Sequence, residues 1–133
     1  MNRKNLLQFV VAIMILMLNV VIVSCSKDDD NNKDNDLIGT WNGYSCADDN
    51  PDDLSQNHTL TLIFRSDGSG DYLEKDNNFS DQCSFTYEKQ SNTRAKAYIS
   101  KRGNFQYFEI VGNKMYVYGH GYGNDLDFLL TKQ

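Results

Sequence analysis

The segment Thr59-Leu60-Thr61-Leu62-Ile63-Phe64-Arg65-Ser66-Asp67-Gly68-Ser69-Gly70 contains the clearest structural pattern in the chain. Its large apolar residues at 60, 62 and 64 alternate with mostly polar ones. Because successive side chains of a strand point to opposite faces of a sheet, this alternation predicts a strand with one buried face. Asp67-Gly68 then predicts a tight turn, since this pair accepts positive φ at low cost. The segment therefore predicts two antiparallel strands, 59–65 and 70–74, joined as a hairpin.

The same β texture continues from residue 37 to residue 131, and none of its windows shows helical periodicity. The other strands are predicted at 37–44, 83–88, 94–99, 105–111, 114–118 and 125–131, with loops at 47–56, 75–82 and 119–123. Eight mostly consecutive strands with short connections predict an all-β antiparallel meander, either folded into a sandwich or closed into a barrel. We favour a small eight-stranded barrel, because closure removes exposed strand edges.

Residues 1–24 have the pattern of an export signal, with Arg3 and Lys4 ahead of the apolar run 6–23. A transmembrane helix is the alternative, since a run of about 18 apolar residues is at the lower limit for spanning a bilayer. The signal is favoured because the run ends in a small residue before Cys25 and is followed by acidic residues. Ile22-Val23-Ser24-Cys25 resembles the lipobox of bacterial lipoprotein precursors.

That resemblance implies cleavage before Cys25 and lipidation of this cysteine, which would anchor the chain in the outer membrane of a Gram-negative cell. Ser26-Lys27-Asp28-Asp29-Asp30 resembles the acidic tag of lipoproteins exposed on the cell surface. A plain solvated spacer is the alternative, so the domain is expected on the periplasmic or the cell-surface face. Residues 25–36 form a flexible acidic tether in either case, because they offer almost nothing apolar to bury.

Charge and composition exclude several classes of partner. Cleavage removes Arg3 and Lys4 and no acid, which leaves 11 basic and 18 acidic residues and a formal charge of −7. This acidic balance disfavours nucleic acid and anionic lipid headgroups. The acidic run 31–36 lacks the central glycine and closing glutamate of a calcium-binding EF-hand loop. We therefore predict neither a metal nor a cofactor.

Two short motifs carry a family resemblance. Leu37-Ile38-Gly39-Thr40-Trp41 and Phe64-Arg65-Ser66-Asp67-Gly68-Ser69-Gly70 resemble the first strand and the following hairpin of lipocalin-like domains in bacterial lipoproteins. The resemblance implies a barrel over residues 37–133, in which Gly39 and Trp41 close one end. In the family a basic side chain from a late strand often lies against this tryptophan, and Lys132 is the nearby cation here.

The larger members of that family bind small apolar ligands inside the barrel. An eight-stranded barrel is only wide enough for its own side chains or for one small ligand. The candidates for the interior are Leu60, Leu62, Phe64, Phe85, Tyr87, Leu126, Phe128 and Leu130. These residues are large enough to fill it, so we predict no apolar cavity in the range of about 300–1,000 Å³ that is typical of ligand sites.

Cys46 and Cys83 remain once Cys25 is lipidated. In an exported domain two cysteines favour a disulfide, with buried free thiols as the alternative. Catalysis by a cysteine and a histidine is disfavoured, because neither cysteine lies in a known catalytic signature. His58 and His120 are the only histidines, and neither lies in a catalytic or metal-binding spacing.

Three classes of function remain. The favoured one is a non-enzymatic binding module that contacts an envelope protein or glycan through loops 47–57 or 119–124. Aromatic residues expected on the outer surface suit such contacts; they are Tyr44, Tyr98, Tyr116, Tyr118 and Tyr122. The alternative is a carrier of a small hydrophobic ligand in the barrel. An enzyme is the least favoured, because the histidines and the aspartates of 48–53 assemble no catalytic set.

Overall fold

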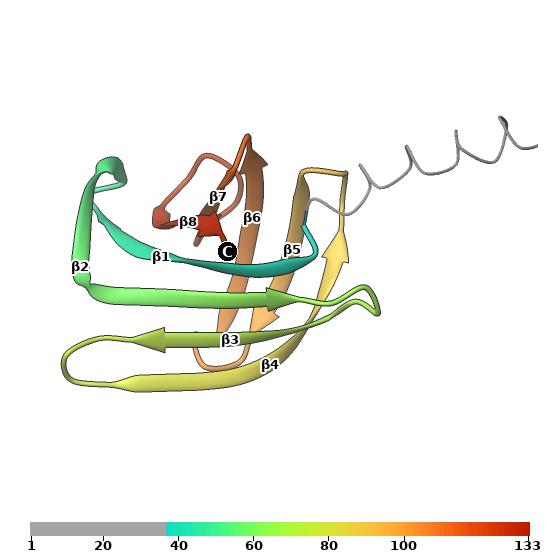
Figure 1. Ribbon diagram of the computed structural model, residues 1–133, viewed down its shortest axis with the longest axis horizontal. Helices are drawn as coiled ribbons and strands as arrows, with labels where there is room; N and C mark the ends of the chain where they lie inside the picture. The colour runs from blue at the N-terminus through green and yellow to red at the C-terminus, as the bar shows by residue number, and fades with distance from the viewer. Residues whose placement is uncertain (1–36) are drawn as a thin grey trace, which may run out of the picture. The chain divides into compact units, whose positions relative to one another are not determined.

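The computed structural model describes residues 37–133, which form a closed barrel of eight strands (Figure 1). The signal 1–24, Cys25 and the tether 25–36 lie outside the described residues. Consecutive strands pair antiparallel, and β8 closes the barrel by pairing with β1. The strands are β1 (Gly39–Ala47), β2 (Asn50–Phe64), β3 (Ser69–Lys75), β4 (Ser80–Lys89), β5 (Arg94–Ile99), β6 (Asn104–Val111), β7 (Lys114–Tyr118) and β8 (Leu126–Lys132).

The all-β meander and its closure are as predicted, and the sandwich alternative is excluded. All eight strands overlap their predicted positions, but the loop predicted at 47–56 is wrong. Asp48 and Asp49 alone make the turn, with φ of 50° and 58°, and β2 begins at Asn50. Aspartate tolerates this left-handed conformation, which two-residue hairpins require. Cys46 pairs with Leu54 and Ala47 pairs with Asn50, so Pro51 lies in an irregular stretch of β2 between these pairs. A strand can accept proline at such an irregularity.

The barrel core contains most of the predicted interior residues. Leu60, Leu62, Phe64, Phe85, Phe128 and Leu130 are all buried in one cluster, and half-buried Tyr87 packs against it. Phe64 is central, since its ring centroid lies 5.1 Å from Tyr87 and 5.2 Å from Phe108. Nine apolar core residues have no accessible surface, so no water-sized void touches them; they are Leu60, Leu62, Tyr72, Ala95, Ile99, Phe108, Met115, Val117 and Leu130.

A second, smaller cluster lies on the outer side of the barrel wall. Leu129 belongs to it, and Leu129 lies between Phe128 and Leu130, which both face the core. Cys46 and Leu126 pack with Leu129 on this outer side. Leu126 was predicted inside; the shift of register between β7 and β8 beside it accounts for the difference.

The predicted Cys46–Cys83 disulfide is not present, because both cysteines are free. Cys46 packs in the outer cluster, whereas Cys83 packs against the barrel core, so the two thiols lie on opposite sides of the wall. Burial, with smaller contributions from Asp127 and Asp49, raises the pKa of Cys46 to about 11. This thiol is therefore protonated at neutral pH and is a poor nucleophile.

The meander places its connections alternately at the two ends of the barrel. The end that contains the start of β1 and the end of β8 is called the Trp41 end. Trp41 is 1% exposed, and its indole Nε1 donates a hydrogen bond of 2.9 Å to the carbonyl of Leu37. Lys132 Nζ lies 5.4 Å from the centroid of the Trp41 ring, as the family resemblance implied. No helix in residues 37–133 is long and apolar enough to cross a membrane.

Candidate functional site

A polar hollow opens at the end opposite Trp41, which we call the mouth. The end of β3, the starts of β4 and β8, the β5–β6 turn and the β7–β8 loop surround a volume of about 400 Å³. Its charged lining consists of Glu74, Asp81, Lys101, Arg102, Asp125 and Asp127, together with His120. The mouth therefore differs in character from the apolar barrel core beneath it.

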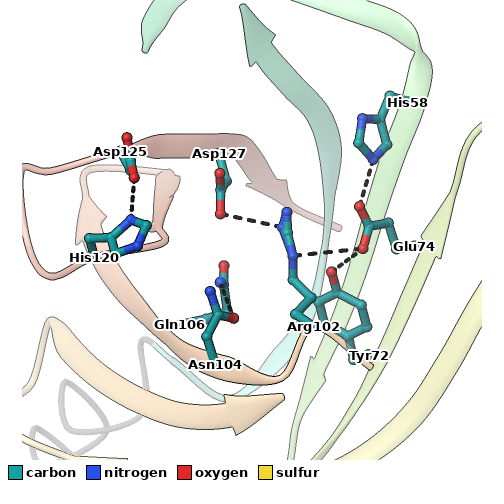
Figure 2. Close-up of polar contacts among 9 residues, drawn as sticks. All are labelled: His58, Tyr72, Glu74, Arg102, Asn104, Gln106, His120, Asp125 and Asp127. Atoms are coloured by element: carbon teal, nitrogen blue, oxygen red, sulfur yellow. Dashed lines mark hydrogen bonds and ion pairs between the residues drawn. The ribbon is translucent and has the colours of Figure 1, made fainter. Parts of the chain in front are cut away.

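Glu74 is the most buried charged residue of the mouth, with its side chain 7% exposed. It points inward because Tyr72 and Glu74 are two residues apart on β3 and so share a face. Glu74 Oε1 lies 2.6 Å from His58 Nε2, and Oε2 accepts a hydrogen bond from the Tyr72 hydroxyl (Figure 2). Burial and then this hydrogen bond raise the pKa of Tyr72, so its hydroxyl stays a donor.

Arg102 lies between Glu74 and a second carboxylate, Asp127 (Figure 2). Its Nε is 4.0 Å from Glu74 Oε2, and its Nη1 is 3.4 Å from Asp127 Oδ2. The guanidinium also stands 5.5 Å from the centroid of the Phe128 ring, which supports it from the core side. Burial raises the pKa of Asp127, and the neighbouring Arg102 opposes that effect. One arginine thus links β3, the β5–β6 turn and β8.

Gln106 lies just beneath the lining, next to Asn104 and close to Asp127 in Figure 2. It is fully buried on β6, and its Nε2 donates a hydrogen bond of 3.1 Å to Asn104 Oδ1. Its Oε1 has no hydrogen-bond partner among the described residues. An unpaired buried acceptor costs about 1–3 kcal/mol, so this amide oxygen lowers the stability of the folded chain.

The rim of the mouth is formed by exposed side chains on short connections. His120 Nδ1 contacts the carboxylate of Asp125 across the β7–β8 loop. That loop is also held from outside, because the Tyr122 hydroxyl lies within hydrogen-bond distance of the Gln90 side chain and of the carbonyl of Ala95. Phe79, on the β3–β4 connection, is 42% exposed and meets the His58 ring at 5.8 Å.

Only part of the expected binding surface lies at the mouth. The predicted loop 119–124 contributes His120 to the rim, whereas residues 50–57 belong to β2. Tyr98 is exposed, while Tyr116 and Tyr118 pack on the outer cluster. A second hollow, of about 370 Å³, lies beside this cluster and is lined by Tyr44, Leu54, Lys114 and Leu129 among others. Among residues 37–133, no group of three or more potential metal ligands converges.

The sequence reasoning missed the centre of the mouth: Tyr72, Glu74, Arg102, Gln106 and Asp127. A signal for two of them was present. Glu74 and Gln106 lie in predicted strands, at positions that the alternation assigns to the inward face. A polar residue on that face is unusual.

Comparisons of the chain with models of protein families, with curated proteins and with solved structures found no match. The closed eight-stranded antiparallel meander is consistent with a lipocalin-like fold.

Proposed function

We propose that this chain is a lipid-anchored, non-enzymatic binding module of the bacterial outer membrane, and that it binds its partner at the mouth. The observation that carries the proposal is the hollow of about 400 Å³ at one end of a barrel whose middle is filled by side chains. Ligand sites are typically concave and contain a few precisely placed polar groups. The mouth has both properties.

The lipid anchor is proposed on the motif Ile22-Val23-Ser24-Cys25 and on the acidic tether 25–36 that follows it. Acylation at Cys25 would hold the barrel near the membrane, and two or more acyl chains make such an anchor stable. The intact mass of the chain from a native membrane fraction tests this. We expect acylated residues 25–133, and a chain that retains residues 1–24 would contradict the anchor.

The mouth is well suited to binding because its polar groups are held in place before a ligand arrives. Glu74 contacts His58, Tyr72 and Arg102, which come from three other positions in the sequence. Arg102 also reaches Asp127, and Tyr122 holds the rim loop against β5. Preorganised groups lose little entropy on binding, so their contacts contribute more to affinity.

The alternative, a carrier of a small hydrophobic ligand inside the barrel, has less support. The fold permits it, but the interior residues Leu60, Leu62, Phe108 and Met115 have no accessible surface. An apolar ligand at the mouth would instead leave charged groups such as Arg102 without water, which is costly.

The experiment is recovery of bound material from an extract of the cell's own envelope, using the immobilised full chain in detergent and mass spectrometry. Lys101→Glu reverses a charge at the rim of the mouth. Its matched control is Lys114→Glu, which makes the same change beside the second hollow.

We expect one recurrent compound, glycan or protein to be recovered with the unaltered chain and with Lys114→Glu, and much less of it with Lys101→Glu. Loss with Lys114→Glu alone would place binding at the second hollow and contradict the proposal. Recovery of a small hydrophobic molecule with all three chains would favour the carrier.

A further inference from the structure

We propose that the mouth takes a neutral, hydroxyl-rich ligand, namely a sugar unit of an envelope glycan. This inference rests on the proposed binding function and names the class of ligand. Three features of the mouth support it: the internal pairing of its charges, its mixture of donors and acceptors, and an exposed aromatic ring at its rim.

Three of the four carboxylates of the mouth contact Arg102 or His120. Arg102 lies between the carboxylates of Glu74 and Asp127, and Asp125 is bonded to His120. At the rim, Lys101 and Asp81 carry opposite charges. A site that selects an ion presents a field of one sign. Four carboxylates against two cations disfavour an anion. A cation also gains little, because Glu74, Asp127 and Asp125 already contact Arg102 or His120.

The hydrogen-bonding groups of the mouth are mixed in the same way. Lys101 and Arg102 only donate, whereas Asp81 and Asp127 only accept. Asn104, which also lines the hollow, both donates and accepts, and Gln106 beside it keeps an unpaired buried Oε1. A hydroxyl group can donate and accept at once. A ligand with several hydroxyls can therefore match neighbouring groups of both kinds, which an apolar molecule cannot.

Phe79 supplies the apolar surface that a sugar ring also needs. Its side chain lines the hollow and is 42% exposed, although a large apolar residue is usually buried. The turn that carries it is fixed by a hydrogen bond of 3.0 Å from the Asp76 amide to the Phe79 carbonyl. The edge contact with His58 at 5.8 Å also limits the orientation of the ring. The C–H face of a sugar can pack on such a ring while its hydroxyls reach the polar lining.

The test is an amide chemical-shift titration of the ¹⁵N-labelled full chain in detergent. The probes are the methyl glycosides of glucose, galactose, mannose and N-acetylglucosamine, with propylammonium and acetate as charged probes. Phe79→Ala removes the proposed stacking surface. Phe105→Ala is the matched control, because Phe105 is 47% exposed, lies on β6 against Tyr98 and does not line the hollow.

We expect at least one glycoside to shift the amides of Lys101, Asn104 and His120, and Phe79→Ala to weaken that binding roughly 2- to 10-fold. Phe105→Ala should leave it unchanged. Binding that depends on Phe105 instead would overturn the site. Binding of propylammonium or acetate at the mouth without any glycoside would overturn the ligand class and leave the mouth as a binding site. Failure of every probe to shift these amides would also overturn the inference, whereas the recovery experiment decides the proposed function separately.

Discussion

Trp41 at one end of the barrel and Arg102 at the other are both held by neighbouring side chains and backbone, but the chemistry differs. Trp41 is 1% exposed and lies against Leu37 and Lys132. The Arg102 side chain is 22% exposed and lies between two carboxylates at an open hollow. Apolar packing stabilises the first end, whereas the second contains charged and unpaired groups that contribute less to stability. On our proposal, the Trp41 end supports the fold and the mouth binds the ligand.

The largest effect is expected from Trp41→Ala. Removing a fully buried indole leaves a cavity, and such changes cost about 3–5 kcal/mol. The free energy of unfolding, measured by urea titration with circular dichroism, should fall by this amount while the ligand profile of the mouth is retained. A loss below about 1 kcal/mol would mean that Trp41 does not support this end of the barrel.

Tyr72→Phe should have the next largest effect, at the mouth. The change keeps the buried ring and removes the hydroxyl that donates to Glu74. A hydrogen bond to a charged group contributes about 1.5–3 kcal/mol, so the free energy of unfolding should fall within that range. Tyr98→Phe is the control, since Tyr98 is 52% exposed, and it should change stability by less than about 0.5 kcal/mol. Equal effects of the two substitutions would contradict the role of Tyr72.

Lys132→Met should have a smaller effect at the Trp41 end. Methionine keeps much of the apolar stem and removes the charge that lies 5.4 Å from the Trp41 ring centroid. A cation–π contact at an exposed site contributes about 0.5–1 kcal/mol. Urea titration of Lys132→Met against Lys114→Met measures it. A loss as large for Lys114→Met would mean that the general charge, rather than the contact with Trp41, is responsible.

The smallest expected effects concern the pH dependence of stability. Its sign differs between a carboxylate near the Trp41 end and one at the mouth. Hydrogen bonds from Ser69 lower the pKa of Asp67 near the Trp41 end, and its stabilising contribution is lost as pH falls through the folded-state pKa. Burial raises the pKa of Asp127, and its contribution is lost as pH rises through the folded-state pKa. Carboxyl ¹³C NMR should therefore show Asp127 titrating at higher pH than Asp67. The reverse order would contradict the burial of Asp127.

Strand positions were predictable because alternation of apolar and polar residues is a local signal, and residues 59–70 carry it strongly. The start of β2 was missed because the turn residues Asp48 and Asp49 are followed by Pro51, which resembles a longer loop. The Cys46–Cys83 disulfide was predicted chiefly from the oxidising compartment and from the number of cysteines. Which side of the wall each cysteine faces depends on bulges in β1 and on the pairing of β1 with β8, which no local pattern reveals.

The mouth was harder to predict than the fold, because its residues meet only after the barrel closes. Glu74, Arg102 and Asp127 come from β3, the β5–β6 turn and β8, and their spacing in the sequence is uninformative. The inward polar positions of Glu74 and Gln106 were the available signal. The Trp41 end, by contrast, was found from a short local motif, Gly39-Thr40-Trp41.

The most direct test of the difference between the ends is carbodiimide footprinting of carboxylates in intact envelopes and in the purified chain. Asp125 lines the mouth and Asp67 lies in the β2–β3 turn near the Trp41 end, and both are exposed. We expect Asp125 to be labelled less in the envelope than after purification, because its ligand covers it there, while the labelling of Asp67 stays the same. Equal labelling of Asp125 in the two samples, or protection of Asp67 instead, would contradict binding at the mouth.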